Sequence, residues 1–330
     1  MTHFVLLLQG AEEQPTASKI LLEYVGFISF FAVYGALGFH FQVLKALRTE
    51  SALTVAGSPV DRADRRAAAI GFFGSVLMIV TLLNGLISRS EDKHISIMGA
   101  VSAGGARQIF QIVCVSLFFV CFALAAQRMR TAWIIAGITG VVYALRNITT
   151  GRWFSMVNPL HEVAASLWIG TLAVMLIAGI TVVFRPTVAG DERGWLVAEM
   201  VNRFSPLALS AATLLGITGV TTAWHHLQHF NALWTSAYGF ALDVKLCVVA
   251  IVVALGAWNW RRMKPKLGDE IGARAIARSA STELSFAAIV LAITALLVSL
   301  PSPGPSGPPG AGGPPSEVKP AAGPRPSPGG

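Results

Sequence analysis

Histidines gather at the end of one apolar segment, at spacings that suit metal binding. His225 and His229 are four residues apart and His226 and His229 three apart, so a continuing helix presents each pair on one face. His161 begins the preceding apolar segment, and Met156 lies five residues before it. Imidazole binds copper, zinc, iron and nickel, and a thioether sulfur favours Cu(I). These five side chains therefore form a candidate copper site.

An anchor at the lipid headgroups is the alternative interpretation of this cluster. Trp224, Phe230 and Trp234 stand beside the histidines, and aromatic residues gather at membrane interfaces. His40 stands alone in a different apolar segment, so we interpret it as a packed or snorkelling histidine.

Further polar residues stand inside apolar segments, where they are costly in lipid. Glu162 adjoins His161 and can orient an imidazole or offset the charge of a cation. Asp243 and Lys245 are two residues apart, so they point to different faces of a helix. These three residues are a candidate polar relay for an ion, and contacts between helices are the alternative.

The composition excludes an ordinary soluble enzyme. Of the 330 residues, 54% are hydrophobic and 13% charged, whereas a soluble domain carries about 25% charged residues. The mean hydropathy is +0.62. The formal net charge of +8 comes from short basic clusters between apolar segments, which set membrane orientation and do not predict nucleic-acid binding. The lipid bilayer is thus the expected partner.

Eight apolar segments approach the length of about 20 residues that a transmembrane helix needs. We therefore expect an all-α fold, a polytopic membrane helix bundle of about eight transmembrane helices. The predicted spans are residues 20–46, 67–88, 108–127, 131–146, 159–184, 204–224, 238–260 and 281–300. Around them the sequence divides into four parts: a polar leader (1–19), a four-helix first half (20–150), a four-helix second half (151–300) and a tail (301–330). Because the tail holds 11 of the 17 prolines and 8 glycines, we expect it to be disordered.

Basic residues predict the orientation of the spans. The odd-numbered connections are richer in Lys and Arg than the even-numbered ones, and none lies between Trp224 and Tyr238. The odd connections should therefore face the cytoplasm, with both termini on the periplasmic side. Six of the seven histidines then map to the outer side, and only His40 lies toward the inner half.

A family resemblance begins at the fifth segment. The stretch His161-Glu-Val-Ala-Ala-Ser-Leu-Trp-Ile-Gly-Thr-Leu172 resembles the opening motif of the CopD/PcoD copper-resistance membrane family. The likeness continues in order to about residue 303, through Arg203-Phe-Ser-Pro-Leu-Ala-Leu209, Thr218-Gly219, Tyr238-Gly239 with Lys245, Ala257-Trp-Asn259, Glu283-Leu284 and Ser299-Leu-Pro301. One departure is Gly170-Thr171, where the family usually has Gly-Gly.

The resemblance implies copper handling at the bacterial inner membrane, in import or tolerance, and no enzymatic activity. The positions carried over by motif are His161, Trp168, Gly170, Arg203, Lys245, Asn259 and Glu283. Only His161 among them is a credible copper ligand. The assignment of the histidines at 225–229 as ligands depends on their spacing alone, and the first four spans match no motif.

Two other functions fit the same residues. A b-type haem electron-transfer protein, an oxidoreductase, would hold its haem between His161 and either His225 or His226 on facing helices. A non-catalytic accessory subunit of a larger membrane complex would dock other membrane or periplasmic subunits through residues 225–238 and the tail.

Overall fold

The computed structural model describes residues 16–47, 57–149, 153–186, 188–227, 237–258, 261 and 270–299. Within these ranges every regular element is helical, which confirms the predicted all-α fold. The long helices are α2 (Ala17–Gly38), α4 (Pro59–Asp92), α6 (Gly105–Ala126), α7 (Arg130–Thr149), α11 (Gly190–Leu227), α13 (Ala237–Trp258) and α14 (Glu270–Ser299). Short elements continue α2 as η1 (Phe39–Leu44) and α3 (Lys45–Leu47), and α5 (Ile97–Ala103) joins α4 to α6. The predicted tail, residues 301–330, lies outside the described residues.

The fifth span is one continuous helix in which α-helical and π-helical segments alternate. It runs through α8 (Trp153–Ala165), the π-helical segment η3 (Ser166–Gly170), α9 (Thr171–Val174), the π-helical segment η4 (Met175–Ile180) and α10 (Thr181–Val183). A third π-helical segment, η1, contacts α9. Such segments are rare and recur at functional sites.

Six of the helices in the described ranges are long and apolar enough to cross a membrane. They cover Ala17–Leu44, Pro59–Asp92, Gly105–Ala126, Met156–Val183, Glu192–Thr222 and Glu270–Ser299. The two other predicted spans correspond to α7 and α13, helices of 20 and 22 residues in the same bundle. The polytopic helix bundle is therefore confirmed.

Several helices are longer than their apolar cores. Helix α4 has 34 residues and begins at Pro59, eight residues before the predicted span. The hydroxyl of Ser58 accepts the backbone N–H of Asp61 at 3.1 Å, and proline suits the first helical position. The cap therefore starts this helix among charged residues that hydropathy assigns to a loop, and Asp64 becomes part of the bundle.

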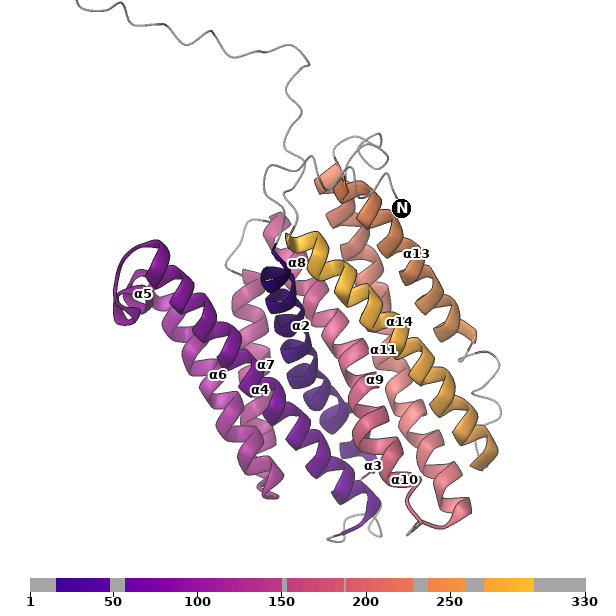
Figure 1. The fold of residues 1–330 in the computed structure, drawn as a ribbon. Coiled ribbons are helices and arrows are strands. Elements are labelled where there is room, and N and C mark those ends of the chain that lie inside the picture. Colours follow the sequence, from indigo (N-terminus) through magenta and orange to yellow (C-terminus); the bar gives the residue numbers. More distant parts are fainter. Residues whose placement is uncertain are drawn as a thin grey trace, which may run out of the picture.

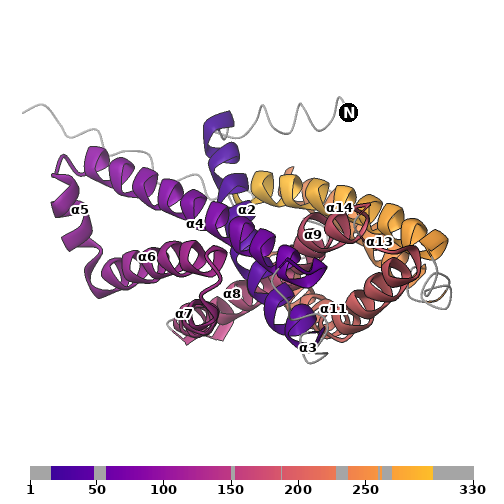
Figure 2. The same cartoon turned by 90° about the horizontal axis from the view of Figure 1, so that it is seen from below.

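Helix α2 lies at the centre of the bundle (Figure 1). It contacts α4, the η3 and α9 parts of the fifth span, and α14. Seen along the bundle, α4 and α6 extend to α5 on one side of α2, while α11, α13 and α14 lie on the other side (Figure 2). The first and second halves of the chain thus meet along α2 and the fifth span.

Two glycines allow a close backbone approach between α2 and the fifth span. A Cβ atom at Gly35 of α2 would overlap the backbone of Gly170 in η3, and a Cβ at Gly170 would overlap the carbonyl of Phe31. Small residues let membrane helices pack backbone against backbone. Gly170 belongs to the Leu-Trp-x-Gly motif, so this part of the motif has a packing role between the two halves.

Candidate functional site

His161 lies in α8 and is held by helix α11. Its Nδ1 atom is 2.8 Å from the hydroxyl oxygen of Thr218. That hydroxyl also donates to the carbonyl oxygen of Leu214 at 2.7 Å. With its one hydroxyl proton on the carbonyl of Leu214, Thr218 accepts from Nδ1–H of the imidazole. In that arrangement Nε2 carries the lone pair, which is the form that binds a metal ion.

The imidazole packs closely against the backbone of α11. A Cβ atom added to Gly219 would be 3.5 Å from Cε1 of His161, an ordinary contact. One turn farther along α11, the hydroxyl of Thr222 donates to Oδ1 of Asn158 at 3.2 Å. These two hydrogen bonds fix the register of α8 against α11. Of the Thr218-Gly219 pair in the family motif, Thr218 thus orients the ring of His161 and Gly219 leaves room for it.

Met156 and the backbone of His225 lie at the same end of the bundle as His161. Asn158 pairs with Thr222 and His161 with Thr218, so α8 and α11 run antiparallel, and Met156 lies beyond Asn158 toward the end of α11. The backbone of His225 is seven residues beyond Thr218 in α11, about 10 Å along the axis. The side chains of His225 and His226 and the whole of His229 lie outside the described residues. Their sharing of an ion with His161 stays a prediction.

Three helices bring charges to this end of the bundle. Lys245 of α13 lies within electrostatic range of His161. Glu23 of α2 lies within electrostatic range of Glu162 in α8, and both carboxylates are half-buried. Asp243 is also half-buried, near the start of α13. A relay through Glu162, Asp243 and Lys245 stays a prediction.

The described part of the chain holds no complete metal site. Within it, no three His, Cys, Asp or Glu side chains come close enough together to bind one ion. The other two described imidazoles are remote from His161: His94 lies in the turn after α4, and His40 lies toward the opposite end of the bundle (Figure 1). The haem alternative therefore has no support among the described residues.

A second polar histidine site was missed by sequence reasoning. Nδ1 of His40, in η1, is 2.7 Å from Oδ1 of Asp64 in α4, and each residue is 7% exposed. The imidazole stacks on Trp133 with ring centroids 4.0 Å apart. His40 is packed, as predicted, and it also has a carboxylate partner. Asp64 escaped notice because the predicted second span begins at residue 67, after the helix has already entered the bundle.

Comparison with known proteins connects the second half of the chain to copper proteins. Residues 198–297, from α11 to α14, match the family described as copper resistance protein D. The protein described as copper transport protein CutJ, from Bacillus subtilis (strain 168), is 29% identical over 151 residues. That alignment covers 45% of this chain and 26% of the relative, so the chain corresponds to about a quarter of the relative's length. No solved structure matches the chain significantly.

The matched residues contain Thr218, Gly219 and Lys245, and they begin after α8. His161 therefore lies outside the family match and is tied to it by its hydrogen bond to Thr218. The resemblance read from the motifs is confirmed for the second half of the chain. Residues 198–297 are thus similar to the copper resistance protein D family.

Proposed function

We propose that this chain is an integral membrane copper-handling protein that binds copper through Nε2 of His161. The observation that carries the proposal is the hydrogen bond between Nδ1 of His161 and Thr218. It holds the ring in one orientation and leaves Nε2 as the electron-pair donor, as a partner of a metal-ligating histidine does. Both the family match and the relative described as a copper transport protein support copper as the ion.

Residues close in sequence to His161 and to the end of α11 supply the further ligands of the proposed site. Met156 supplies a thioether, and His225, His226 and His229 supply imidazoles. Thioether and imidazole together favour Cu(I) over the hard divalent cations. We infer a site that captures the ion with these side chains and passes it to His161, deeper along α8.

Movement of copper across the membrane is the further step of the proposal. Glu162 adjoins His161 in sequence, and Lys245 of α13 lies in electrostatic range of it. Asp243 precedes Lys245 by two residues in α13. Intramembrane charges at such positions commonly line ion pathways. The basic end of the bundle would face the cytoplasm of a bacterial cell, which places His161 toward the outer side of the inner membrane.

The test is a Cu(I) titration of the purified chain in detergent, against a chromophoric Cu(I) chelator. His161→Ala should weaken copper binding by more than the roughly 10–100-fold caused by loss of a ligand's hydrogen-bond partner. His94→Ala is the matched control, because His94 lies in an exposed turn at the same end of the bundle. Equal affinities for wild type and His161→Ala would disprove the proposed site.

Transport has its own measurement. Copper uptake into proteoliposomes that contain the wild-type chain should exceed uptake into empty liposomes. The variant Lys245→Leu should change the uptake rate by a larger factor than it changes the Cu(I) affinity, since neither lysine at neutral pH nor leucine is a copper ligand. Binding without any uptake would restrict the protein to a copper-binding role.

A further inference from the structure

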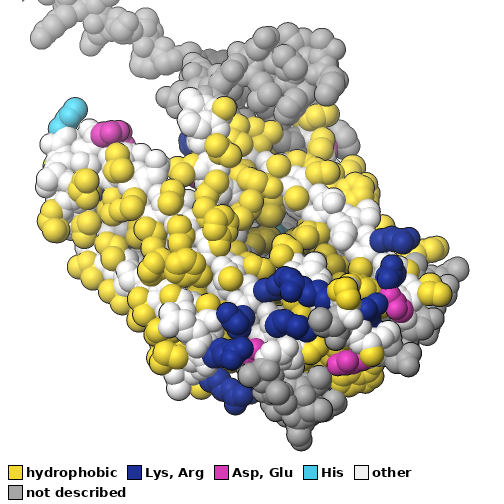
Figure 3. All heavy atoms as spheres, turned by 60° about the horizontal axis from the view of Figure 1, so that its bottom comes forward, with side chains coloured by type: hydrophobic (Ala, Val, Ile, Leu, Met, Phe, Trp, Pro, Cys, Tyr) yellow, Lys and Arg dark blue, Asp and Glu magenta, His cyan; other side chains and the backbone are white. Residues whose placement is uncertain are grey.

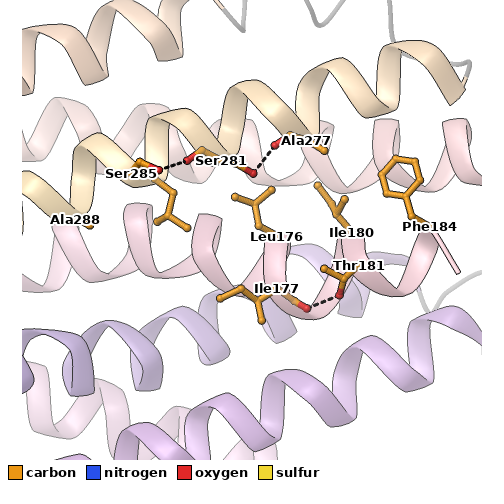
Figure 4. Close-up of a pocket in the computed structure, with 10 residues that line it drawn as sticks. Leu176, Ile177, Ile180, Thr181, Phe184, Ala277, Ser281, Ser285 and Ala288 are labelled. Carbon is orange, nitrogen blue, oxygen red and sulfur yellow. Dashed lines mark hydrogen bonds between the residues drawn. The ribbon is translucent and has the colours of Figure 1, made fainter.

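An apolar groove runs along the outside of the bundle at the end opposite His161. It lies between the η4–α10 part of the fifth span and α14, and its volume is about 830 Å³ (Figure 4). Leu176, Ile180 and Phe184 form one wall, and Ala277, Leu284 and Ala288 form the other. The groove is separate from the His161 site and from every residue of the copper resistance motifs except Leu284.

The hydroxyl groups in the groove are already satisfied. Ser281 donates to the carbonyl of Ala277 at 2.7 Å, and Ser285 donates to that of Ser281 at 3.0 Å. Thr181 donates to the carbonyl of Ile177 at 2.6 Å (Figure 4). Because these donors point back into their own helices, the groove offers an occupant mainly hydrocarbon contact. A polar solute would lose hydration there without gaining hydrogen bonds.

The dimensions suit a lipid chain. The α14 wall runs from Ala277 to Ala288, about 17 Å at 1.5 Å per residue. One leaflet contributes about half of the hydrocarbon core of ~30 Å. The groove runs along the helices, so it extends from one membrane surface to about the middle of the bilayer.

Two arginines from different helices reach the surface end of the groove. The Nη1 atom of Arg66, in α4, donates to the hydroxyl of Thr181 at 2.8 Å. The guanidinium of Arg274, in α14, lies over the ring of Phe184, 5.7 Å from its centroid. No described carboxylate bonds Arg66. The carboxylate of Glu270 forms ion pairs with both Arg274, at 2.6 Å, and Arg193, at 3.0 Å, so one negative charge is shared by two cations.

More positive charge surrounds this end of the bundle. Arg185 follows α10 directly and Arg278 follows Ala277 in α14, and both are exposed. Figure 3 shows Lys and Arg side chains gathered across this face, with few acidic groups among them. The same basic residues predict that this end faces the cytoplasm, where the leaflet carries anionic lipids.

We propose that the groove binds one anionic phospholipid of the cytoplasmic leaflet, with an acyl chain between α10 and α14 and its phosphate held by Arg66 and Arg274. A guanidinium binds phosphate through paired, charge-assisted hydrogen bonds, and the apolar walls hold the chain. The bound lipid joins three helices, because Arg66 belongs to α4, Arg274 to α14 and the groove wall to the fifth span.

Native mass spectrometry of the purified, delipidated full chain tests the proposal. Phosphatidylglycerol and phosphatidylcholine with identical acyl chains are added in turn. One phosphatidylglycerol should stay bound at collision energies that remove phosphatidylcholine. The double variant Arg66→Gln and Arg274→Gln should reduce the affinity for phosphatidylglycerol about tenfold or more, because hydrogen bonds to charged groups are lost. Arg107→Gln, an exposed arginine at the opposite end of the bundle, is the charge-matched control.

A second pair of variants tests the groove itself. Ser285→Trp places an indole where the acyl chain would lie and should abolish retention of the lipid. Ser210→Trp is the control, since Ser210 is also exposed and bonds a carbonyl of its own helix, at 3.0 Å, outside the groove. Equal retention of the two lipids by the wild type would overturn the headgroup assignment. Undiminished binding by Ser285→Trp would overturn the groove as the site.

Discussion

The two described histidines inside the bundle differ in the partner of one ring nitrogen. Nδ1 of His161 lies 2.8 Å from a neutral hydroxyl, and Nδ1 of His40 lies 2.7 Å from a carboxylate oxygen. His161 is half-buried beside Gly219, while His40 is buried between Trp133 and Phe41. The Thr218 hydroxyl holds the ring of His161 and leaves its Nε2 available to a metal ion. The buried carboxylate of Asp64 bonds the ring of His40 and suits a structural link between η1 and α4.

The contrast separates the proposed metal ligand from a structural histidine by the partner of Nδ1. His161 is the proposed copper ligand, whereas the pair of His40 and Asp64 joins η1 to α4. Each of the following variants should affect one property, copper affinity or stability, far more than the other.

Asp64→Ala should have the largest effect and should act on stability. It removes the carboxylate bonded to a buried imidazole, and breaking a buried charged pair costs about 3–5 kcal/mol. The midpoint of thermal unfolding in detergent should fall clearly, and Asp64→Asn should lose less because an amide still accepts the hydrogen bond. Copper affinity of the folded fraction should stay within about twofold. A large loss of copper affinity at unchanged stability would reverse the roles assigned to the two histidines.

Thr218→Val should have the next largest effect and should act mainly on copper. The substitution keeps the shape of the side chain and removes the acceptor for Nδ1–H of His161. Loss of such a partner typically lowers metal affinity about 10–100-fold. Thr218→Ser should restore most of the affinity, since it returns the hydroxyl. If the valine variant binds Cu(I) like the wild type, the hydrogen bond does not prepare His161 for the metal.

Gly219→Ala should have the smallest effect. The added methyl group would meet Cε1 of His161 at 3.5 Å, which is an ordinary contact. We expect copper affinity to change by less than about threefold, and stability by less than about 1 kcal/mol. The same Cu(I) titration measures it. A larger loss would mean that a metal or a second ligand occupies the space beside this glycine.

Hydropathy predicted the main elements well, because each span needs only its own residues to be recognised. Six spans meet the membrane criterion, and α7 and α13 appear as helices where two more were expected. The ends of the helices were less predictable. Helix α4 continues through Arg62, Asp64 and Arg66 because Ser58 and Pro59 start it there, and an apolar-segment search stops at charged residues. Because the predicted second span began after Asp64, the sequence did not indicate this residue as a partner of His40.

The sequence by itself determined that this is a helical membrane protein, that His161 is a candidate ligand and that residues near 198–297 resemble copper resistance proteins. Composition, spacing and motifs are local properties, so they can be read along the chain. Only the tertiary structure decided that Thr218, 57 residues away, bonds His161, that Gly35 meets Gly170, and that Arg66 and Arg274 converge on one groove. These pairings depend on how helices rotate and cross, which is set by packing between segments that are distant in sequence.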